Sequence, residues 1–510
     1  MIISNIRLPF THTKDQLEHK IKQMCGHNRI YKYQIRRKSV DARNKSNILY
    51  VYTVEVYIKE SEYIEKKLLL DDIKEINLKC RPVIAGTGPA GLFCGLYLAK
   101  AGLCPILLEQ GNPVEKRAED VNSFWQKSQL NESSNIQFGE GGAGTFSDGK
   151  LNTGIKGTLS KEVLEVFARF GAGEEITYLA KPHIGTDVLR KVIVNIRNEI
   201  ISLGGEFHFG SKMHDFAVSG GKVESVFADK EYKTECLVLA IGHSARETFA
   251  LLHQKGVILQ PKPFSVGFRI EHPQKLINMS QYGILNDKLL AADYKLSEHL
   301  SSGRGVYTFC MCPGGYVVGA SSENGGVVTN GMSYRKRDAQ NANSALLVSV
   351  TPEDFAAKHS LSGIDFQREI EKRAFSIGGE NFNAPCQLLG DFLKNKTSDS
   401  FGDVSPTYLP GVKKADITKV LPEFVCDALK QVIPKMAEKI KNFDLYDAVL
   451  TAAETRSSSP VRILRNDEFE ASTRGIYPTG EGAGYAGGIT SSAADGIRVA
   501  LKIIEKSRKV

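Results

Sequence analysis

Residues 83–109 begin with an apolar strand and a glycine turn: Val-Ile-Ala-Gly86-Thr-Gly88-Pro-Ala-Gly91-Leu-Phe-Cys-Gly-Leu-Tyr-Leu-Ala-Lys-Ala-Gly-Leu-Cys-Pro-Ile-Leu-Leu-Glu109. A helix and a second apolar strand follow, and that strand ends in an acid. This order is typical of a dinucleotide-binding βαβ unit. Gly86 permits the tight turn, Gly88 lets the backbone approach a pyrophosphate, and Gly91 lets helix and strand pack closely. We expect phosphate at the helix N-terminus and a ribose hydroxyl at Glu109.

The bare glycine pattern also occurs at residues 139–144 and 482–487. Only 83–109 has a buried-type strand before it, a helix after it, and an acid at the end of a second strand within about 30 residues. The context therefore places the nucleotide unit at 83–109. An ordinary glycine-rich turn is the alternative interpretation.

Composition indicates a globular protein of about three domains. The chain has 510 residues, of which 42% are hydrophobic and 24% charged. No apolar run approaches the roughly 20 residues of a membrane helix, and the N-terminus lacks a basic region followed by an apolar core. Nine cysteines, an odd number spread from Cys25 to Cys426, do not indicate a disulfide framework. These features predict a cytoplasmic protein that is not membrane-bound and has no metal site.

The formal charge of +8 is concentrated near the N-terminus, since residues 1–80 hold 16 Lys and Arg against 10 Asp and Glu. A nucleic-acid partner and a solvated basic face both fit this excess. Apolar patterning predicts three strands and one helix here, at 2–8, 30–35 and 48–58 and at 14–24. We expect a small basic α/β domain at 1–78.

The remaining chain divides into three predicted parts of an α/β protein. Residues 79–262 form the first part of a Rossmann-like nucleotide-binding domain, and residues 263–444 form an inserted substrate domain of mixed α+β structure. Residues 445–510 return to complete the first domain.

The C-terminal glycines decide between NAD and FAD as the cofactor. Only 22 residues follow Gly488, enough for one helix but not for a second complete dinucleotide unit. A helix that begins at Gly487, Gly488 and Ile489 offers backbone N–H groups and a positive dipole end to the pyrimidine edge of a flavin. Glu481 is placed to accept from the ribityl chain. The sequence therefore favours FAD.

Four segments resemble the glutathione-reductase-type flavoproteins: Gly86-x-Gly88-x-x-Gly91 with Glu109, the run Gly141–Lys150, the run Leu237–Arg246, and the run Gly480–Ile489. More narrowly, the chain resembles the bacterial family of uncharacterised FAD-dependent dehydrogenases. That likeness also includes Tyr307-Thr-Phe-Cys-Met-Cys-Pro-Gly-Gly315 and Asn330-Gly-Met-Ser-Tyr-Arg335, so it spans most of the chain.

The resemblance implies a glutathione-reductase-type fold, non-covalent FAD, and a loop at 139–150 that runs under the flavin. Together, the motifs and the resemblance give these candidate cofactor residues: Gly86, Gly88, Pro89, Ala90, Gly91, Glu109, Gly141, Gly142, Ser147, Asp148, Gly242, Gly480, Glu481, Gly487, Gly488 and Ile489.

Catalytic candidates are few, because a flavin enzyme needs little more than a positioned substrate and a proton acceptor. Lys150 is a candidate to stabilise anionic reduced flavin. Cys310 and Cys312 suit redox chemistry, with a pair of small strand residues as the alternative. Arg456 and Arg462 can bind an anionic substrate with their planar forks, although a structural salt bridge with Glu454 fits equally well.

The sequence therefore predicts an FAD-dependent oxidoreductase, a dehydrogenase acting on an unidentified anionic organic substrate. Because no second NAD domain is visible, NAD(P)H would have to dock transiently as reductant. A nucleic-acid-associated flavoprotein that modifies or binds RNA through its basic N-terminus is one alternative. A redox-sensing flavoprotein without turnover is another.

Overall fold

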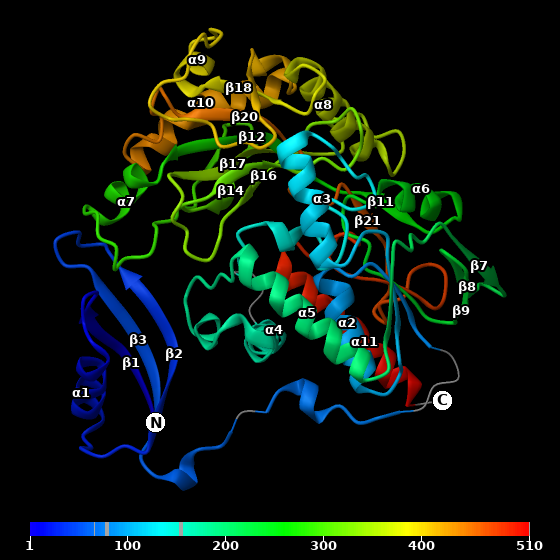
Figure 1. Cartoon of the computed structure of the whole chain (residues 1–510), viewed down its shortest axis with the longest axis horizontal. Helices are drawn as coiled ribbons and strands as arrows, with labels where there is room; N and C mark the ends of the chain where they lie inside the picture. Colours follow the sequence, from blue (N-terminus) through cyan, green and yellow to red (C-terminus); the bar gives the residue numbers. More distant parts are fainter. Residues whose placement is uncertain (66, 77–80, 152–156, 509–510) are drawn as a thin grey trace.

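The structure is a computed structural model that describes residues 1–65, 67–76, 81–151 and 157–508 (Figure 1). The predicted boundary between residues 78 and 79 lies outside these residues. Two large bodies, one built on a parallel sheet and one on an antiparallel sheet, face each other. A small N-terminal body stands at their side (Figure 1).

The N-terminal body is a three-stranded antiparallel sheet with one helix. Its strands are β1 (Ile2–Pro9), β2 (Lys32–Asp41) and β3 (Leu49–Tyr57), in the order β1-β3-β2, and its helix is α1 (Lys14–Cys25). Alternating side chains of β3, among them Tyr52 and Val54, are buried against Leu17 and Ile21 of α1. The predicted elements are all present, although β2 begins and ends later than its pattern indicated.

The nucleotide-type body contains a parallel five-stranded sheet. Its order is β22 (Ile476–Pro478), β10 (Leu237–Leu239), β4 (Val83–Ala85), β5 (Ile106–Glu109) and β6 (Glu206–Phe209). All four pairings between neighbours are parallel. The last strand of the chain thus completes a sheet that begins at residue 83. The Rossmann-like α/β fold class is confirmed.

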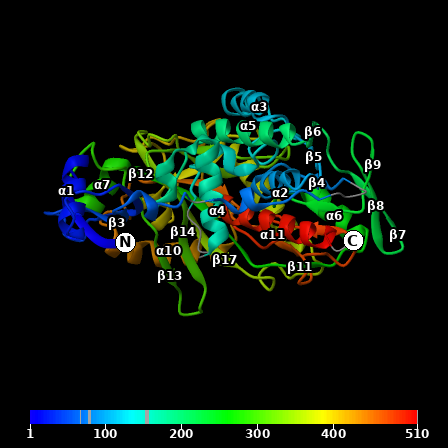
Figure 2. The ribbon, with the colours of Figure 1, turned by 90° about the horizontal axis from the view of Figure 1, so that it is seen from below.

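Different layers cover the two faces of this parallel sheet. On one face α2 (Pro89–Lys100), α5 (Thr186–Ser202) and α11 (Ile489–Ser507) pack with α4 (Thr158–Phe167). On the other lies the antiparallel sheet of β7 (Asp215–Ser219), β8 (Lys222–Phe227) and β9 (Glu231–Lys233), with α6 (Arg246–Gln254). Helices α2 and α11 lie side by side (Figure 2), so closely that a Cβ at Gly496 would stand 2.1 Å from the Ala90 carbonyl oxygen.

The second large body is built on a seven-stranded sheet. The order is β13 (Ser297–His299), β14 (Gly305–Cys312), β17 (Asn341–Val350), β12 (Phe264–Pro273), β20 (Val449–Glu454), β18 (Ala384–Leu388) and β19 (Val412–Lys414). Pairings from β13 to β18 are antiparallel, and β18 pairs with β19 in parallel. The remaining elements of this body are α7 (Gln274–Tyr282), α8 (Ser362–Gly378), α9 (Leu389–Leu393), α10 (Glu423–Lys439) and the hairpin of β15 (Tyr316–Gly319) and β16 (Thr329–Met332).

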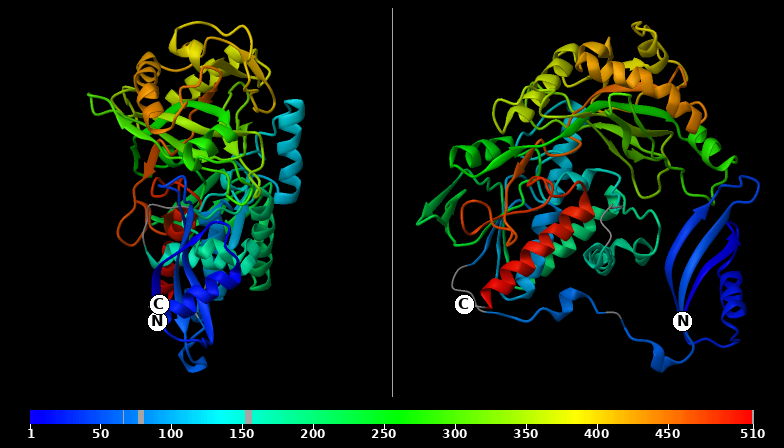
Figure 3. Two further views of the ribbon diagram at one scale, coloured as in Figure 1. Left: turned by 90° about the vertical axis from the view of Figure 1, so that its left-hand side faces the viewer. Right: turned by 180° about the vertical axis from the view of Figure 1, so that it is seen from behind.

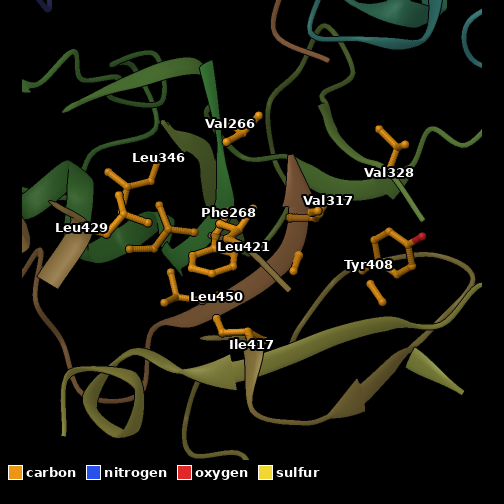
Figure 4. Close-up of a cluster of buried hydrophobic side chains, with 14 of the residues drawn as sticks. Val266, Phe268, Val317, Val328, Leu346, Tyr408, Ile417, Leu421, Leu429 and Leu450 are labelled. Carbon is orange, nitrogen blue, oxygen red and sulfur yellow. The ribbon is translucent and has the colours of Figure 1, made fainter. Parts of the chain in front are cut away.

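The hydrophobic core of this body lies between the sheet and its helices. Phe268 and Leu450 from the sheet pack with Leu421, which precedes α10, and with Leu429 of α10 (Figure 4). Figure 3 shows α10 along one side of this sheet, with the parallel body and α11 below it.

The chain passes between the two large bodies through paired short strands. β11 (Leu259–Pro261) and β21 (Val461–Ile463) are antiparallel neighbours. Strand β20 is hydrogen-bonded to β12 and β18, so residues 449–454 belong to the seven-stranded sheet. The predicted domain boundary after residue 444 therefore falls one strand too early. Backbone pairing assigns β20 to the second body, and composition does not show such pairing.

Candidate functional site

A cavity of about 470 Å³ lies where the two large bodies meet. Its walls include the loop after β4, the loop 137–150, the start of α11, and residues of β14, β16 and β20. The predicted residues that line it are Gly86, Gly88, Pro89, Ala90, Glu109, Gly142, Ser147, Lys150, Gly242, Cys310, Arg456, Glu481, Gly487, Gly488 and Ile489. Segments far apart in the sequence thus form one concave site.

The three glycines of the first motif have different surroundings. Gly86 has φ +101°, and a Cβ there would stand 2.4 Å from the Ala240 carbonyl oxygen. A Cβ on Gly91 would stand 1.9 Å from the Gly86 oxygen, so this glycine is needed for packing and does not line the cavity. A Cβ on Gly88 would meet only the Gly142 Cα, at 3.7 Å. The protein itself therefore tolerates a side chain at Gly88, whereas a bound pyrophosphate would not.

Glu109 ties together the loops around the nucleotide end of the cavity. One oxygen accepts from the Thr87 backbone N–H at 2.9 Å and from the Thr87 hydroxyl at 2.8 Å. The other accepts from the N–H groups of Gly111 and Gly139, each at 3.0 Å. These bonds use all four lone-pair sites of the carboxylate. A ribose hydroxyl would have to share them, and that contact stays a prediction.

Arg117, a residue of α3 (Val114–Lys127), shapes the loop 135–142 from beneath. This fully buried side chain donates to five carbonyl oxygens, those of Asn135, Ile136, Gly139, Glu140 and Gly142, at 2.6–3.1 Å. Burial lowers the pKa of Arg117 to about 10, so the side chain remains charged at neutral pH. The loop is thus anchored by one cation, which leaves the other side of the loop to face the cavity.

The glycines at the start of α11 give the flavin end of the cavity its shape. A Cβ at Gly487 or Gly488 would meet nothing within 4 Å, and both residues line the cavity. Gly488 is the N-cap of α11 and offers no side-chain cap, so helix N–H groups remain available to a ligand. A Cβ at Gly144 would stand 2.7 Å from Ile489, which places loop 139–150 against this helix end.

Glu481 and His243 form a polar pair in the cavity wall. The Nδ1 of His243 is 3.2 Å from a carboxylate oxygen of Glu481. The other ring nitrogen, Nε2, is buried and has no hydrogen-bond partner among the described residues. This unpartnered nitrogen lies in a cavity wall where Gly88, Gly487 and Gly488 leave the backbone uncovered by side chains. Together these features fit a bound polar ligand with phosphate, ribityl and ring parts.

Four predicted cofactor residues do not line the cavity: Gly91, Gly141, Asp148 and Gly480. Asp148 is fully buried behind Lys150 and pairs with it at 2.9 Å, and Arg337 binds the same carboxylate. Burial alone would lower the pKa of Lys150, but the charge of Asp148 outweighs it and raises that pKa. Asp148 therefore keeps Lys150 charged and in place from behind the cavity wall.

The arginine segment after β20 serves the junction between the two bodies. Arg456 binds Glu371 of α8 through two nitrogens at 2.9 and 3.0 Å, and Arg246 of α6 binds the same carboxylate. Arg462 stacks on Tyr485 and does not line the cavity. Arg456 thus has the salt-bridge role left open by the sequence, with Glu371 as partner in place of Glu454. No arginine fork is free in the cavity within the described part of the chain to hold an anionic substrate.

Glu454 instead pairs with the fully buried Arg269 of β12, at 2.6 and 3.0 Å. Arg269 also donates to the Cys310 carbonyl oxygen at 3.1 Å, and Thr329 donates to Glu454 at 2.9 Å. These bonds fix the wall that the seven-stranded body presents to the cavity.

Several lining residues carried no sequence signal. Ser211, Lys212 and Met213 stand beside Glu109 in a stretch without a glycine motif. Thr308 and Asn330 face the cavity from β14 and β16, and only backbone pairing over long sequence distances brings them there. The role of Arg117 was also missed, because its position in an amphipathic helix resembles that of any surface cation.

Comparisons with known proteins identify the family and the cofactor. Residues 263–457 match a family described as "FAD-dependent protein, C-terminal domain-like", and residues 1–57 match a domain of unknown function. An uncharacterized protein from Clostridium beijerinckii is 47% identical over 526 residues, covering 99% of this chain and 98% of that protein. The chain belongs to the same family as this Clostridium protein, and its residues 263–457 match the FAD-dependent family. FAD is its cofactor, and the glycine-lined cavity is the place that fits it.

Likenesses to solved structures are distant. E. coli quinol fumarate reductase FrdA shares 11% identity, with a TM-score of 0.36 over 84% of this chain and 70% of that one. The halogenase PltM shares 12%, with a TM-score of 0.38 over 85% and 70%. Scores this low add nothing to what the chain itself shows. Among the described residues, no helix is long and apolar enough to cross a membrane, and no group of three His, Cys, Asp or Glu residues forms a metal site.

Proposed function

We propose that the chain is an FAD-dependent dehydrogenase that acts on a small organic molecule in the central cavity. The observation that carries this proposal is the composition of the walls. One cavity extends from Glu109 and the α2 N-terminus to Thr308 and Asn330 of the second body. The first end suits a dinucleotide, and the second has no counterpart in the nucleotide-binding motif, so it supports a substrate site against the flavin.

Within this proposal, backbone groups do most of the cofactor binding. The N–H of Ala90 and its neighbours at the start of α2 would face the pyrophosphate. Those that follow Gly488 would face the pyrimidine edge of the ring, where the dipole of α11 favours the negative charge of the reduced form. Lys150, kept charged by Asp148, adds a cation at the same end. FAD supplies the acceptance of a hydride.

The protein would supply position and protons to the substrate. Thr308 and Asn330 offer polar contacts from the second body, and the His243 Nε2 offers a buried proton-accepting atom. NAD(P)H would dock at the same face as a transient reductant. Because Arg456 and Arg462 are engaged elsewhere, the negative charge proposed for the substrate has no arginine partner in the described cavity wall.

Anaerobic bleaching of the bound flavin by a panel of metabolites, with NADH and NADPH included, tests the proposal. We expect at least one organic compound to reduce the flavin. Asn330→Leu should slow that reduction and leave the FAD content unchanged, because Asn330 lies on the wall of the second body. Ser211→Ala, at the nucleotide end, is the matched control and should reduce at the normal rate. A protein that a chemical reductant bleaches but no metabolite does would contradict the dehydrogenase and favour a redox sensor.

A further inference from the structure

Two cysteines lie at and directly behind the wall of the FAD cavity. Cys310 and Cys312 lie two residues apart on β14, and the Cys312 thiol donates to the Cys310 carbonyl oxygen at 3.3 Å. The register of β14 against β17 shifts between Phe309 and Cys312, and Cys310 has φ +44°. This bulge bends the strand between the two cysteines, and the Cys312 thiol turns back onto the Cys310 peptide.

The two thiols differ in access. Cys310 is half-buried and lines the cavity, while Cys312 is fully buried behind it and does not. Among the described residues, six other cysteines have free thiols and lie away from the cavity wall: Cys25, Cys94, Cys104, Cys236, Cys386 and Cys426. The arrangement of one accessible thiol backed by a second is the one that dithiol chemistry requires.

Positive charge surrounds the accessible thiol. The ammonium of Lys150 donates to the Met311 carbonyl oxygen, between the two cysteines, and Arg269 donates to that of Cys310. The neighbouring Cys312 thiol lowers the pKa of Cys310, and the charges of Lys150 and Arg269 lower it further although burial opposes them. The neighbouring Cys310 and burial raise the pKa of Cys312. Of the two side chains, the one on the cavity side is therefore the more easily deprotonated.

The pair also stands at the flavin end of the cavity. Lys150 connects it to loop 139–150, and the next residue, Leu151, accepts from the Thr490 hydroxyl in the first turn of α11 at 2.9 Å. That turn is the one at which we place the pyrimidine edge of the flavin.

We propose that Cys310 and Cys312 form a redox-active dithiol that exchanges electrons with the FAD in this cavity. The proposal rests on the proposed function, since it needs the flavin ring at the α11 end. In the forward direction, an S–S bond forms between the Cys310 thiolate and the Cys312 thiol, whose S–H bond breaks. Two electrons and the Cys312 proton pass to oxidised FAD, which becomes the singly protonated anionic reduced form. The reverse step returns them. Together the flavin and the pair store twice the electrons of the flavin alone.

Anaerobic reductive titration of the holoenzyme tests this without any substrate. Wild type should take up roughly two more electrons per FAD than Cys310→Ser or Cys312→Ser, because each variant lacks the disulfide couple. Cys25→Ser, a half-buried cysteine in the N-terminal body, is the matched control and should titrate like wild type. Equal uptake by wild type and both variants would overturn the proposal.

Thiol trapping gives a second measurement that needs only the wild-type protein. After oxidation, alkylation and peptide mass analysis should find residues 310 and 312 joined by a disulfide, and after reduction both should be alkylated. Free thiols at both positions after oxidation would overturn the proposal even where a serine variant fails to bind FAD. Failure of the proposed function is distinguishable, because a protein whose flavin no metabolite reduces can still take up the two additional electrons from a chemical reductant at its disulfide.

Discussion

Glu371 should be the carboxylate whose loss most weakens the junction between the two large bodies. It is 2% exposed and holds two guanidinium groups, those of Arg246 and Arg456. Removing one partner of a buried ion pair costs about 3–5 kcal/mol, because the remaining charge stays buried without compensation. Glu371→Gln keeps the size of the side chain and removes only its charge, so we expect a loss of about 3 kcal/mol or more.

The assay is equilibrium unfolding in urea, followed by the shift in midpoint at an unchanged slope. Glu369→Gln is the matched control on the same helix: its carboxylate is 71% exposed and lies 3.8 Å from Arg373. We expect that variant to stay within about 0.5 kcal/mol of wild type. Equal midpoints for Glu371→Gln and Glu369→Gln would refute the assignment of Arg456 to a structural ion pair.

The difference in the free energy of unfolding between wild type and Glu371→Gln should depend on pH with a definite sign. Burial alone would raise the pKa of Glu371, but the charges and hydrogen bonds of Arg246 and Arg456 outweigh burial and hold that pKa below its usual value of 4.5. A group with a lowered folded-state pKa contributes stability above its unfolded-state pKa and loses it as the pH falls toward the folded-state value. The difference between wild type and Glu371→Gln should therefore be full near pH 7 and shrink below about pH 4.5. A difference that grows on acidification would contradict this ion network.

Three further predictions concern the cavity and the N-terminal body. Lys150→Met should retain FAD but lower the reduction potential of the flavin by roughly 30–60 mV, since a hydrogen bond or charge contact to an anion is worth about 1.5–3 kcal/mol. Lys212→Met, at the nucleotide end, is the control and should leave that potential unchanged. Equal flavin potentials in the wild type and both variants would contradict the role of Lys150. Deleting residues 1–57 should leave FAD bound, because none of them lines the cavity, and loss of the yellow colour would show that they are needed for the site. The RNA-binding alternative requires an affinity for RNA that falls steeply with salt concentration. Because Arg36 and Arg43 are paired with Glu55 and Asp41, we expect filter binding to detect no such affinity. RNA binding with a steep salt dependence would restore that alternative.

Local patterns were enough to predict the parallel body. The apolar strand at residues 83–85, the glycine turn and the second strand ending at Glu109 are encoded in one continuous segment, so their arrangement follows from spacing alone. The return of the chain near 476–478 was also predictable, because too few residues follow Gly488 for a separate fold.

The second body could not be derived in the same way. Its central strand β12 pairs with β17 and β20, and the paired residues of those two strands lie about 70 to more than 180 residues further along the chain. Nothing in the local pattern of 264–273 specifies those partners. The partner of Arg456 was uncertain for the same reason, since Glu371 lies 85 residues away and Glu454 is adjacent in sequence. Sequence proximity favoured Glu454 as the partner of Arg456, whereas strand pairing places Glu454 beside Arg269.

The FAD content of Gly88→Val tests the central claim most directly, namely that FAD lies across the α2 N-terminus in this cavity. Within the protein, a Cβ at Gly88 makes only one ordinary contact, at 3.7 Å, so the variant should fold as wild type does by circular dichroism and urea unfolding. Denaturing the wild-type protein should release about one FAD per chain on chromatography. Folded Gly88→Val should release little or none, because the valine side chain occupies the approach to the pyrophosphate. Normal FAD content in Gly88→Val, or release of FMN or NAD from the wild type, would contradict the claim.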